Sequence, residues 1–457
     1  MHSIWAVARN TMAQAVRMKI AAAVIFLLLA LLPMMSVITT GDGTLLGKLQ
    51  SFSSYGISLV SFLLSILTIS MACFTLSSDL HRRTLDLVVT KPIARCQIVL
   101  GKFLGVMVLN LILLAGFACI VYGLTMAMPS LTDSDPAQQA QAETEFFTAR
   151  KSVSVQIEAD AVAKRVEERI EKLKKEGQMP DQMSLSQIRQ TLTQQEQVSE
   201  KSVELAAAKE WDFQNVFPPR DPNAVLFVRY KLLASPDPPN EEIFGQWRIG
   251  DFRQFKMGIQ KFKTPVYAVE QSDSVRTIHE IKIPAAAVAE DGHVTVAFFN
   301  SPDYNVSTVI FEQMEVLYKV GSFGTNFFRV VLLIAVRLIF LAALGVSLST
   351  WLSFPVAALC SLNVFFAGLV NGFFMEAIGS LGAFLGLVYQ FTIRWMLHII
   401  PRFDGPYSPT DYIVSGEVLP WLFLIRAALL TLGVQMLLLL AVGIWIFHRR
   451  EIAKITV

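Results

Sequence analysis

The amino-acid sequence predicts an α-helical polytopic membrane protein with six transmembrane helices and an inserted extracytoplasmic α+β domain. Hydrophobic residues make up 53% of the 457 residues, and the mean hydropathy of +0.49 is too high for an ordinary soluble protein. A helix needs roughly 20 apolar residues to cross a hydrocarbon core of about 30 Å, and stretches of that kind occupy both ends of the chain. Between them, from residue 130 to about 324, the sequence is polar enough to form a water-soluble domain.

The N-terminal residues 1–19 predict a cytoplasmic helix that lies in the membrane interface, because apolar residues alternate there with Arg9, Arg17 and Lys19. The apolar stretch 20–38 is the first predicted span. No small-x-small cleavage site follows it, so we expect a retained anchor and not a signal peptide.

Two further spans are predicted at 55–76 and 103–126, which completes a first transmembrane section over 20–128. Short loops rich in Lys and Arg stay cytoplasmic, so the loop 78–95 between these spans should face the cytoplasm. Its apolar residues predict an amphipathic helix, which Pro92 ends because the residue before proline is disfavoured in the α region. The charged residues of the loop are Asp79, His81, Arg82, Arg83, Asp86, Lys91 and Arg95.

At these residues the chain resembles the permeases of ABC exporters of the second type, in which the helix between the second and third spans docks into a groove of the ATPase. The residues that carry the likeness are Asp79, Arg82-Arg83-Thr84-Leu85, Leu87-Val88-Val89, Thr90-Lys91-Pro92 and Gly101-Lys102-Phe103-Leu104-Gly105. The family more often has Glu where Asp79 stands. The resemblance implies that Asp79, Arg82, Arg83, Thr84, Leu85, Asp86, Lys91 and Pro92 couple the chain to an ATPase. From composition alone, a positively charged cytoplasmic loop without a partner is an equal alternative.

The segment 41–48 resembles a phosphate-binding loop but does not match it. The motif requires glycine where Asp42 stands and Ser or Thr where Leu49 stands. We therefore expect that this chain is not itself an enzyme and binds no cofactor, and that ATP and Mg are used by a separate ATPase subunit.

The polar section begins with a predicted extracytoplasmic helical hairpin over 129–210. Gly177 and Pro180 should separate its two helices, and Ser184 with Gln187 resembles a capping box for a second helix that runs to about Lys209. The hairpin could project toward a partner or pack on its own domain. The first helix is predicted from the apolar residues Val155, Ala159, Val162, Val166, Ile170 and Leu173.

Residues 211–325 predict an extracytoplasmic β-sandwich, because short runs rich in β-branched and aromatic residues alternate with turn sequences. This pattern of short strands and turns is similar to that of jelly-roll carbohydrate-binding modules. Trp247, Tyr267 and Tyr304 could stack on a sugar, although core packing is the commoner role of such residues. The predicted strands are 225–230, 243–249, 266–269, 277–283, 293–299 and 316–318.

The last section, 326–457, should contain the fourth, fifth and sixth transmembrane helices, at 327–350, 354–374 and 419–447. Basic residues follow the last span and should be cytoplasmic, which requires an even number of crossings. We therefore expect residues 377–418 to form an interfacial or re-entrant segment and not a seventh span.

Three polar residues within the spans are candidates for a translocation path: Arg337, Asn363 and Asn371. Arg337 lies roughly 12 Å deeper along its helix than Arg329, and an ionisable group near the middle of a bilayer usually faces a bundle interior or an aqueous path. It could bind an anionic part of a cargo or lock two helices. Equally, its side chain could reach toward the membrane interface or pair with an acid such as Glu376.

The sequence thus predicts an inner-membrane permease subunit that pairs with itself or a sister permease, docks ATPase subunits through 78–95 and drives export. The alternative is a membrane-anchored extracytoplasmic module that binds or transmits force to an envelope protein without cargo transport. A neighbouring reading frame for an ABC ATPase would favour the first. Contacts with membrane lipids are expected in both cases, whereas no catalytic set, metal-ligand cluster or nucleic-acid surface is evident.

Overall fold

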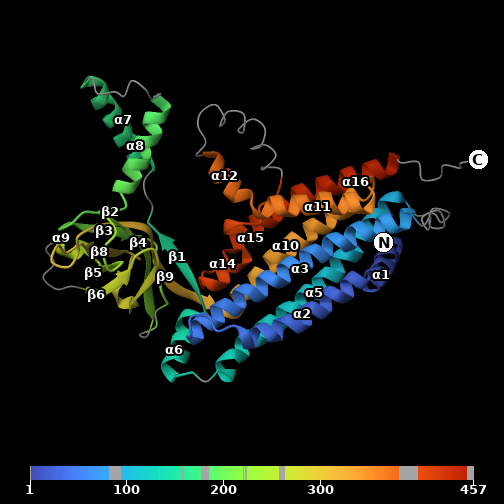
Figure 1. Ribbon diagram of the computed structural model, residues 1–457, viewed down its shortest axis with the longest axis horizontal. Helices are drawn as coiled ribbons and strands as arrows, with labels where there is room; N and C mark the ends of the chain where they lie inside the picture. Colours follow the sequence, from blue (N-terminus) through green and yellow to red (C-terminus); the bar gives the residue numbers. More distant parts are fainter. Residues whose placement is uncertain are drawn as a thin grey trace, which may run out of the picture. The chain divides into compact units, whose positions relative to one another are not determined.

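A computed structural model describes residues 2–81, 94–132, 134–155, 159–176, 185–219, 221, 224–256, 263–379 and 400–449 (Figure 1). The chain divides into two compact units. The helical unit comprises Met1–Ala149 and Gly321–Val457, and the β unit comprises Arg150–Val320.

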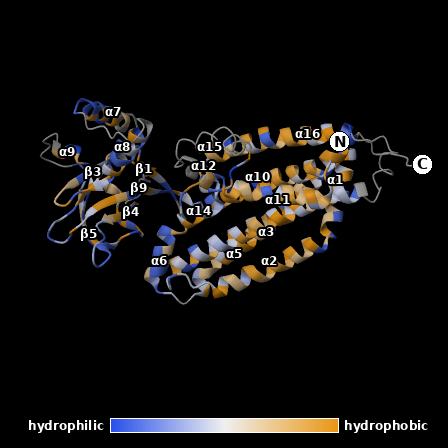
Figure 2. Cartoon of the chain, turned by 45° about the horizontal axis from the view of Figure 1, so that its top comes forward, coloured by the Kyte–Doolittle hydropathy of each residue, from blue (hydrophilic) through white to orange (hydrophobic). Residues whose placement is uncertain are grey.

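Within the described residues, five helices of the helical unit are long and apolar enough to cross a membrane. Figure 2 shows their hydrophobic colouring along most of their length. This finding, together with the separate β-sheets, is consistent with a multi-pass membrane protein that carries a β domain. The five are α2 (Lys19–Ile38), α3 (Leu45–His81), α5 (Arg95–Leu131), α10 (Phe323–Leu348), and a last helix made of α15 (Trp421–Ala428), a π-helical stretch (Leu429–Met436) and α16 (Leu437–Arg449).

The predicted fifth span, 354–374, is not one continuous helix. Helix α11 (Phe354–Leu369) has 16 residues, or roughly 24 Å, and α12 (Asn371–Gly379) follows it. The break has a packing cause: the Phe403 N–H donates to the Gly368 carbonyl, and Asp404 accepts a hydrogen bond from the Gly372 N–H. A sixth span therefore remains a prediction. Residues 380–399 of the predicted re-entrant segment lie outside the described residues.

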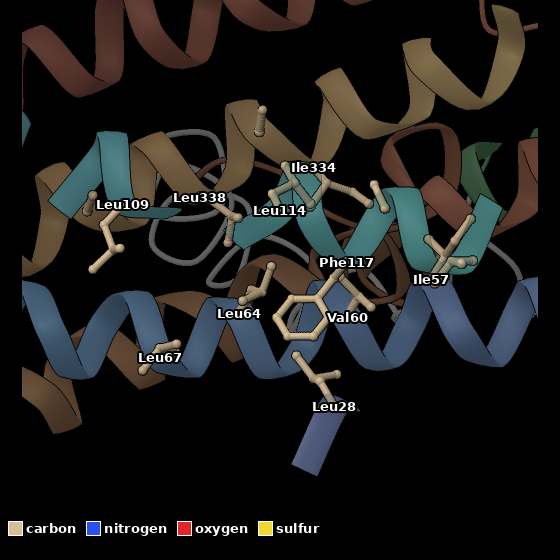
Figure 3. Close-up of a cluster of buried hydrophobic side chains, with 14 of the residues drawn as sticks. Leu28, Ile57, Val60, Leu64, Leu67, Leu109, Leu114, Phe117, Ile334 and Leu338 are labelled. Atoms are coloured by element: carbon tan, nitrogen blue, oxygen red, sulfur yellow. The ribbon is translucent and has the colours of Figure 1, made fainter. Parts of the chain in front are cut away.

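Buried apolar side chains hold α2, α3, α5 and α10 together. Figure 3 shows Leu28 of α2, Leu64 of α3, Phe117 of α5 and Leu338 of α10 converging on this core. Among the described residues, the unit's other helical elements are α1 (His2–Val16), α6 (Pro136–Glu145), α14 (Pro409–Val414) and a 3-10 turn (Gly405–Tyr407).

The β unit contains the predicted sandwich of two sheets. Tyr230 and Phe311 of one sheet pack against Trp247 and Phe298 of the other. The ring centroids lie 4.4 Å apart for Tyr230 and Trp247, 5.6 Å for Trp247 and Phe311, and 5.0 Å for Phe298 and Phe311. One sheet has the order β1-β9-β4-β7 with β2 beside β9, and the other has the order β3-β8-β5-β6. The strands are β1 (Thr148–Ser154), β2 (Ser202–Val203), β3 (Ala208–Phe213), β4 (Val225–Ser235), β5 (Glu242–Gly250), β6 (Tyr267–Ser274), β7 (Ile278–Pro284), β8 (Val294–Phe299) and β9 (Thr308–Ser322), with short helical turns at Arg253–Lys256 (α9) and Ala285–Ala287.

The helical hairpin is present, but its second helix is shorter than predicted. Helices α7 (Ala159–Lys175) and α8 (Leu185–Ser199) pack through Val166, Ile170, Ile188 and Leu192, and Arg169 pairs with Glu196 at 2.8 Å. The extension to Lys209 is wrong, because β2 pairs with β9 and Lys209 pairs with Phe298 in the β3–β8 ladder. Strand β1 also lies inside the region predicted as helical. Residues 177–184, which include Ser184 of the predicted capping box, lie outside the described residues.

Candidate functional site

The first candidate site is the end of the helical unit where α3 ends at His81 and α5 begins at Arg95, which we call the loop end. The residues 82–93 between these helices lie outside the described residues, and with them the predicted coupling residues Arg82, Arg83, Thr84, Leu85, Asp86, Lys91 and Pro92. Asp79 is the one predicted coupling residue that the structure describes.

Asp79 forms an ion pair with Lys102, whose side chain is only 2% exposed. The Lys102 ammonium also donates to the Thr75 carbonyl at 3.0 Å and to Gln14 Oε1 at 3.2 Å. The Gln14 amide in turn donates to Asp79 at 3.4 Å. A buried charge is tolerated when it is paired and hydrogen-bonded, so this network fixes α1, α3 and α5 to one another at the loop end.

Helix α1 packs closely against the first turns of α5 because glycines there lack a side chain. A Cβ at Gly101 would lie 2.6 Å from Val7 Cβ, and one at Gly105 would lie 2.6 Å from the Ala8 carbonyl oxygen. Ser3 also donates to the Gln97 side chain at 3.0 Å. This glycine pair, a GxxxG spacing, therefore serves packing within the chain.

Arg95 connects the start of α5 to the last helix. Its Nη1 donates to the His448 carbonyl at 2.7 Å and to the Phe447 carbonyl at 3.4 Å. The last carbonyls of a helix have no partner within the helix and carry partial negative charge, so a guanidinium stabilises them. Four helices, α1, α3, α5 and α16, are thus joined around the two ends of the segment 82–93.

The second candidate site surrounds Arg337, which is 6% exposed on α10. Its Nη1 donates to Ser61 Oγ at 3.0 Å, its Nη2 donates to the Phe403 carbonyl at 3.0 Å, and its Cζ lies 4.9 Å from the centre of the Phe403 ring. Among the described side chains, no carboxylate forms an ion pair with Arg337. The Glu376 side chain, a predicted alternative partner, is outside the described residues.

Arg337 lines a cavity of about 190 Å³ between α3, α11 and the segment 403–410. Ser58, Ser61, Ser408 and Thr410 bring hydroxyl groups to this cavity. A charge at the centre of a bilayer costs roughly 2.5–3.5 kcal/mol or more, which favours its placement beside hydroxyl groups such as these.

The other two predicted path residues do not join Arg337. Asn363 is exposed on α11 and donates to the Leu359 carbonyl of its own helix at 2.9 Å. Asn371 is 1% exposed and donates to the Ile400 carbonyl at 3.2 Å, so it holds the start of α12 against the segment that begins at residue 400.

The three aromatic residues predicted to stack on a sugar differ in burial. Trp247 is 1% exposed in the sandwich core and cannot reach a sugar, which corrects that prediction. Tyr267 packs partly buried against the same core. Tyr304 is 65% exposed, and its ring centroid lies 4.4 Å from that of Phe244.

Among the described residues, no group of three or more His, Cys, Asp or Glu side chains could hold a metal ion. The described residues on either side of 82–93 are held to neighbouring helices by the Asp79–Lys102 ion pair and by the hydrogen bonds of Gln14 and Arg95. Compared with known proteins, the chain matches no family model and no curated protein sequence.

Proposed function

We propose that this chain is the permease subunit of an ATP-driven exporter of the second ABC type, and that residues 78–95 dock a separate ATPase subunit. The permease acts with a second copy of itself or with a sister permease in an inner membrane. It has six spans, its loop end faces the cytoplasm, and its β unit and helical hairpin lie outside.

The observation that carries this proposal is the ion pair between Asp79 and the buried Lys102. The two residues stand at either end of the motif that resembles the docking segment of such permeases. Because the network around them includes Gln14 of α1, and Arg95 holds the end of α16, a force applied to 82–93 would reach four helices together. That is the mechanical requirement for coupling ATP hydrolysis to helix movement.

Co-purification from native membranes tests the proposal. An affinity-tagged chain, expressed with its genomic neighbours, should retain a protein that hydrolyses ATP. The double variant Arg82→Ala/Arg83→Ala should lose that protein while its own thermal unfolding midpoint stays unchanged. Lys48→Ala is the matched control, because Lys48 contacts Thr132 at the opposite end of α3.

Two outcomes would contradict docking: a native chain that purifies without any ATPase, or a double variant that retains the ATPase at the wild-type ratio. The first outcome would favour the alternative, a membrane-anchored module for an envelope partner. In that case the hairpin α7–α8 would be the surface that binds the partner, because it exposes the charged side chains of Arg165, Glu167 and Arg189.

A further inference from the structure

The cavity beside Arg337 has a polar wall with unused hydrogen-bonding capacity. A guanidinium has five N–H donors, and the contacts of Arg337 to Ser61 and to the Phe403 carbonyl account for two of them. Ser58 and Thr410, whose hydroxyl oxygens lie 3.1 Å apart, complete this wall. The other N–H groups of the guanidinium and the Ser61 hydroxyl can donate hydrogen bonds to an anion. The Ser408 hydroxyl already donates to Asp411 Oδ1 at 3.1 Å, and one of the Ser58 and Thr410 hydroxyls donates to the other.

Apolar side chains also line part of the cavity. Ile57, Phe62, Phe365 and Leu369 line it, and the rings of Phe62 and Phe365 lie 6.1 Å apart. Phe62 is 39% exposed, so this apolar lining continues to the outer surface of the helical unit. A hydrocarbon tail that leaves the cavity on this side would remain in contact with apolar side chains.

An irregular backbone segment lies beside Arg337, and its position can be compared with the depth of Arg337 along α10. Arg337 is roughly 21 Å along the helix from Phe323, near the middle of a predicted span. Irregular backbone at membrane depth occurs only where it is buried in protein or lines a polar cavity. The segment that includes Phe403 and Ser408 meets that condition, because it supplies one carbonyl to Arg337 and one hydroxyl to the cavity.

We propose that this cavity binds the anionic head group of an amphipathic molecule, a phosphate or carboxylate, while its hydrocarbon tail lies against Phe62 and Phe365. The cavity of about 190 Å³ is large enough to hold a phosphate or carboxylate head group. The inference deepens the proposed function, on which it rests, by naming the chemical class of the cargo.

Native mass spectrometry of the full-length chain, released from a neutral detergent, tests the site. The probes are phosphatidic acid, phosphatidylcholine with the same acyl chains, and inorganic phosphate. We expect the first phosphatidic acid adduct to form at least about tenfold more readily than the phosphatidylcholine adduct. Arg337→Gln should reduce it about tenfold, since it removes a charged donor. Arg426→Gln is the matched control: Arg426 is an exposed arginine of α15 that does not line the cavity, and this variant should bind as the wild type does.

A second variant keeps the test valid if Arg337→Gln does not fold. Ser58→Leu places a larger side chain at an exposed position that lines the cavity and leaves Arg337 in place, and it should lower the adduct by a similar factor. Undiminished binding by a folded Arg337→Gln or Ser58→Leu variant would overturn the proposal, and so would equal binding of inorganic phosphate. Because no ATPase is present, failure here leaves the docking proposal intact, and failure of ATPase co-purification leaves this measurement interpretable.

Discussion

The Lys102 ammonium of α5 is paired with the Asp79 carboxylate of α3, and only 2% of the lysine side chain and 20% of the aspartate side chain are exposed. The pair joins α3 and α5, the two helices on either side of residues 82–93. It also brings in Gln14 of α1, which contacts both charged groups. The loop end is therefore held by one small polar network in apolar surroundings.

Lys102→Met should destabilise the helical unit by about 3 kcal/mol, because removal of one partner leaves the carboxylate without its counter-charge. The double variant Asp79→Asn/Lys102→Met should be less destabilised than the sum of the two single variants, since the two residues are in contact. Thermal unfolding of the purified chain in detergent measures both effects. Lys48→Met, at the far end of α3, should have a much smaller effect because Lys48 is partly exposed. Additive single variants would show that the pair is not coupled.

Gly105→Ala should loosen the packing of α1 on α5. The added Cβ would lie 2.6 Å from the Ala8 carbonyl oxygen, and overpacking of this kind typically costs about 1–3 kcal/mol. Gly116→Ala in the same helix is the control, because a Cβ there meets nothing within 4 Å, and better helix propensity should make it neutral or stabilising. Protease cleavage of α1 in the purified chain reports the difference. Equal cleavage of the two variants would contradict the close approach.

The sequence predicted elements with a clear local pattern and missed those that depend on distant partners. The β-branched and aromatic residues of β4 to β8 predict strands there. By contrast, the residues around Ser202–Val203, which include several Ala, Glu and Lys, predict helix where β2 lies. Its pairing with Val309 and Ile310 of β9 overrides that preference. The residues next to β2 in the sequence do not indicate that it pairs with β9.

The candidate sites divide in the same way. The motif around Asp79 and the depth of Arg337 were visible in the sequence. The role of Lys102 was not, because its partners Asp79 and Gln14 come from two other helices and only packing brings them together. Trp247 has a side chain equally suited to a core and to a sugar platform, so burial alone decides its role.

Trp247→Ala should destabilise the β unit by about 3–5 kcal/mol, the usual cost of removing a large buried aromatic side chain. Tyr304→Ala should cost about 0.5 kcal/mol or less, because Tyr304 is 65% exposed at the surface. Hydrogen exchange of peptides from β5 and β8 in the full chain compares the two variants. A strong loss of protection in Tyr304→Ala, with little in Trp247→Ala, would reverse this assignment.

Stability of the β unit should fall in acid because of Glu280. Burial alone would raise the pKa of Glu280, but the guanidinium groups of Arg150 and Arg229 outweigh it and lower that pKa below its usual value of 4.5. A lowered folded-state pKa gives stabilisation that is complete above about pH 4.5 and is lost as the pH falls through the folded-state value.

Glu280→Gln should therefore destabilise β4 and β7 at pH 7 by about 3 kcal/mol, since Arg150 and Arg229, both buried, each lose an ion pair. The difference from the wild type should shrink at pH values below the folded-state pKa. Hydrogen exchange at several pH values, corrected for intrinsic rates, measures it. Glu270→Gln, at an exposed position of β6, is the control and should leave the stability of the β unit at pH 7 nearly unchanged.

The loop end and the β unit should lie on opposite sides of the membrane, because α5 is the one predicted crossing between Cys96 and the inserted residues. Cys96 is an exposed native thiol in the first turn of α5, so it can report the loop end without a new substitution. Asp237→Cys, at a position 57% exposed, reports the β unit. In a background where Cys73, Cys119 and Cys360 are replaced by alanine, an impermeant maleimide should label residue 237 but not Cys96 in right-side-out spheroplasts. Inverted vesicles should give the opposite pattern. Labelling of both thiols from the same side would remove the cytoplasmic position that docking of an ATPase requires, and the proposed function with it.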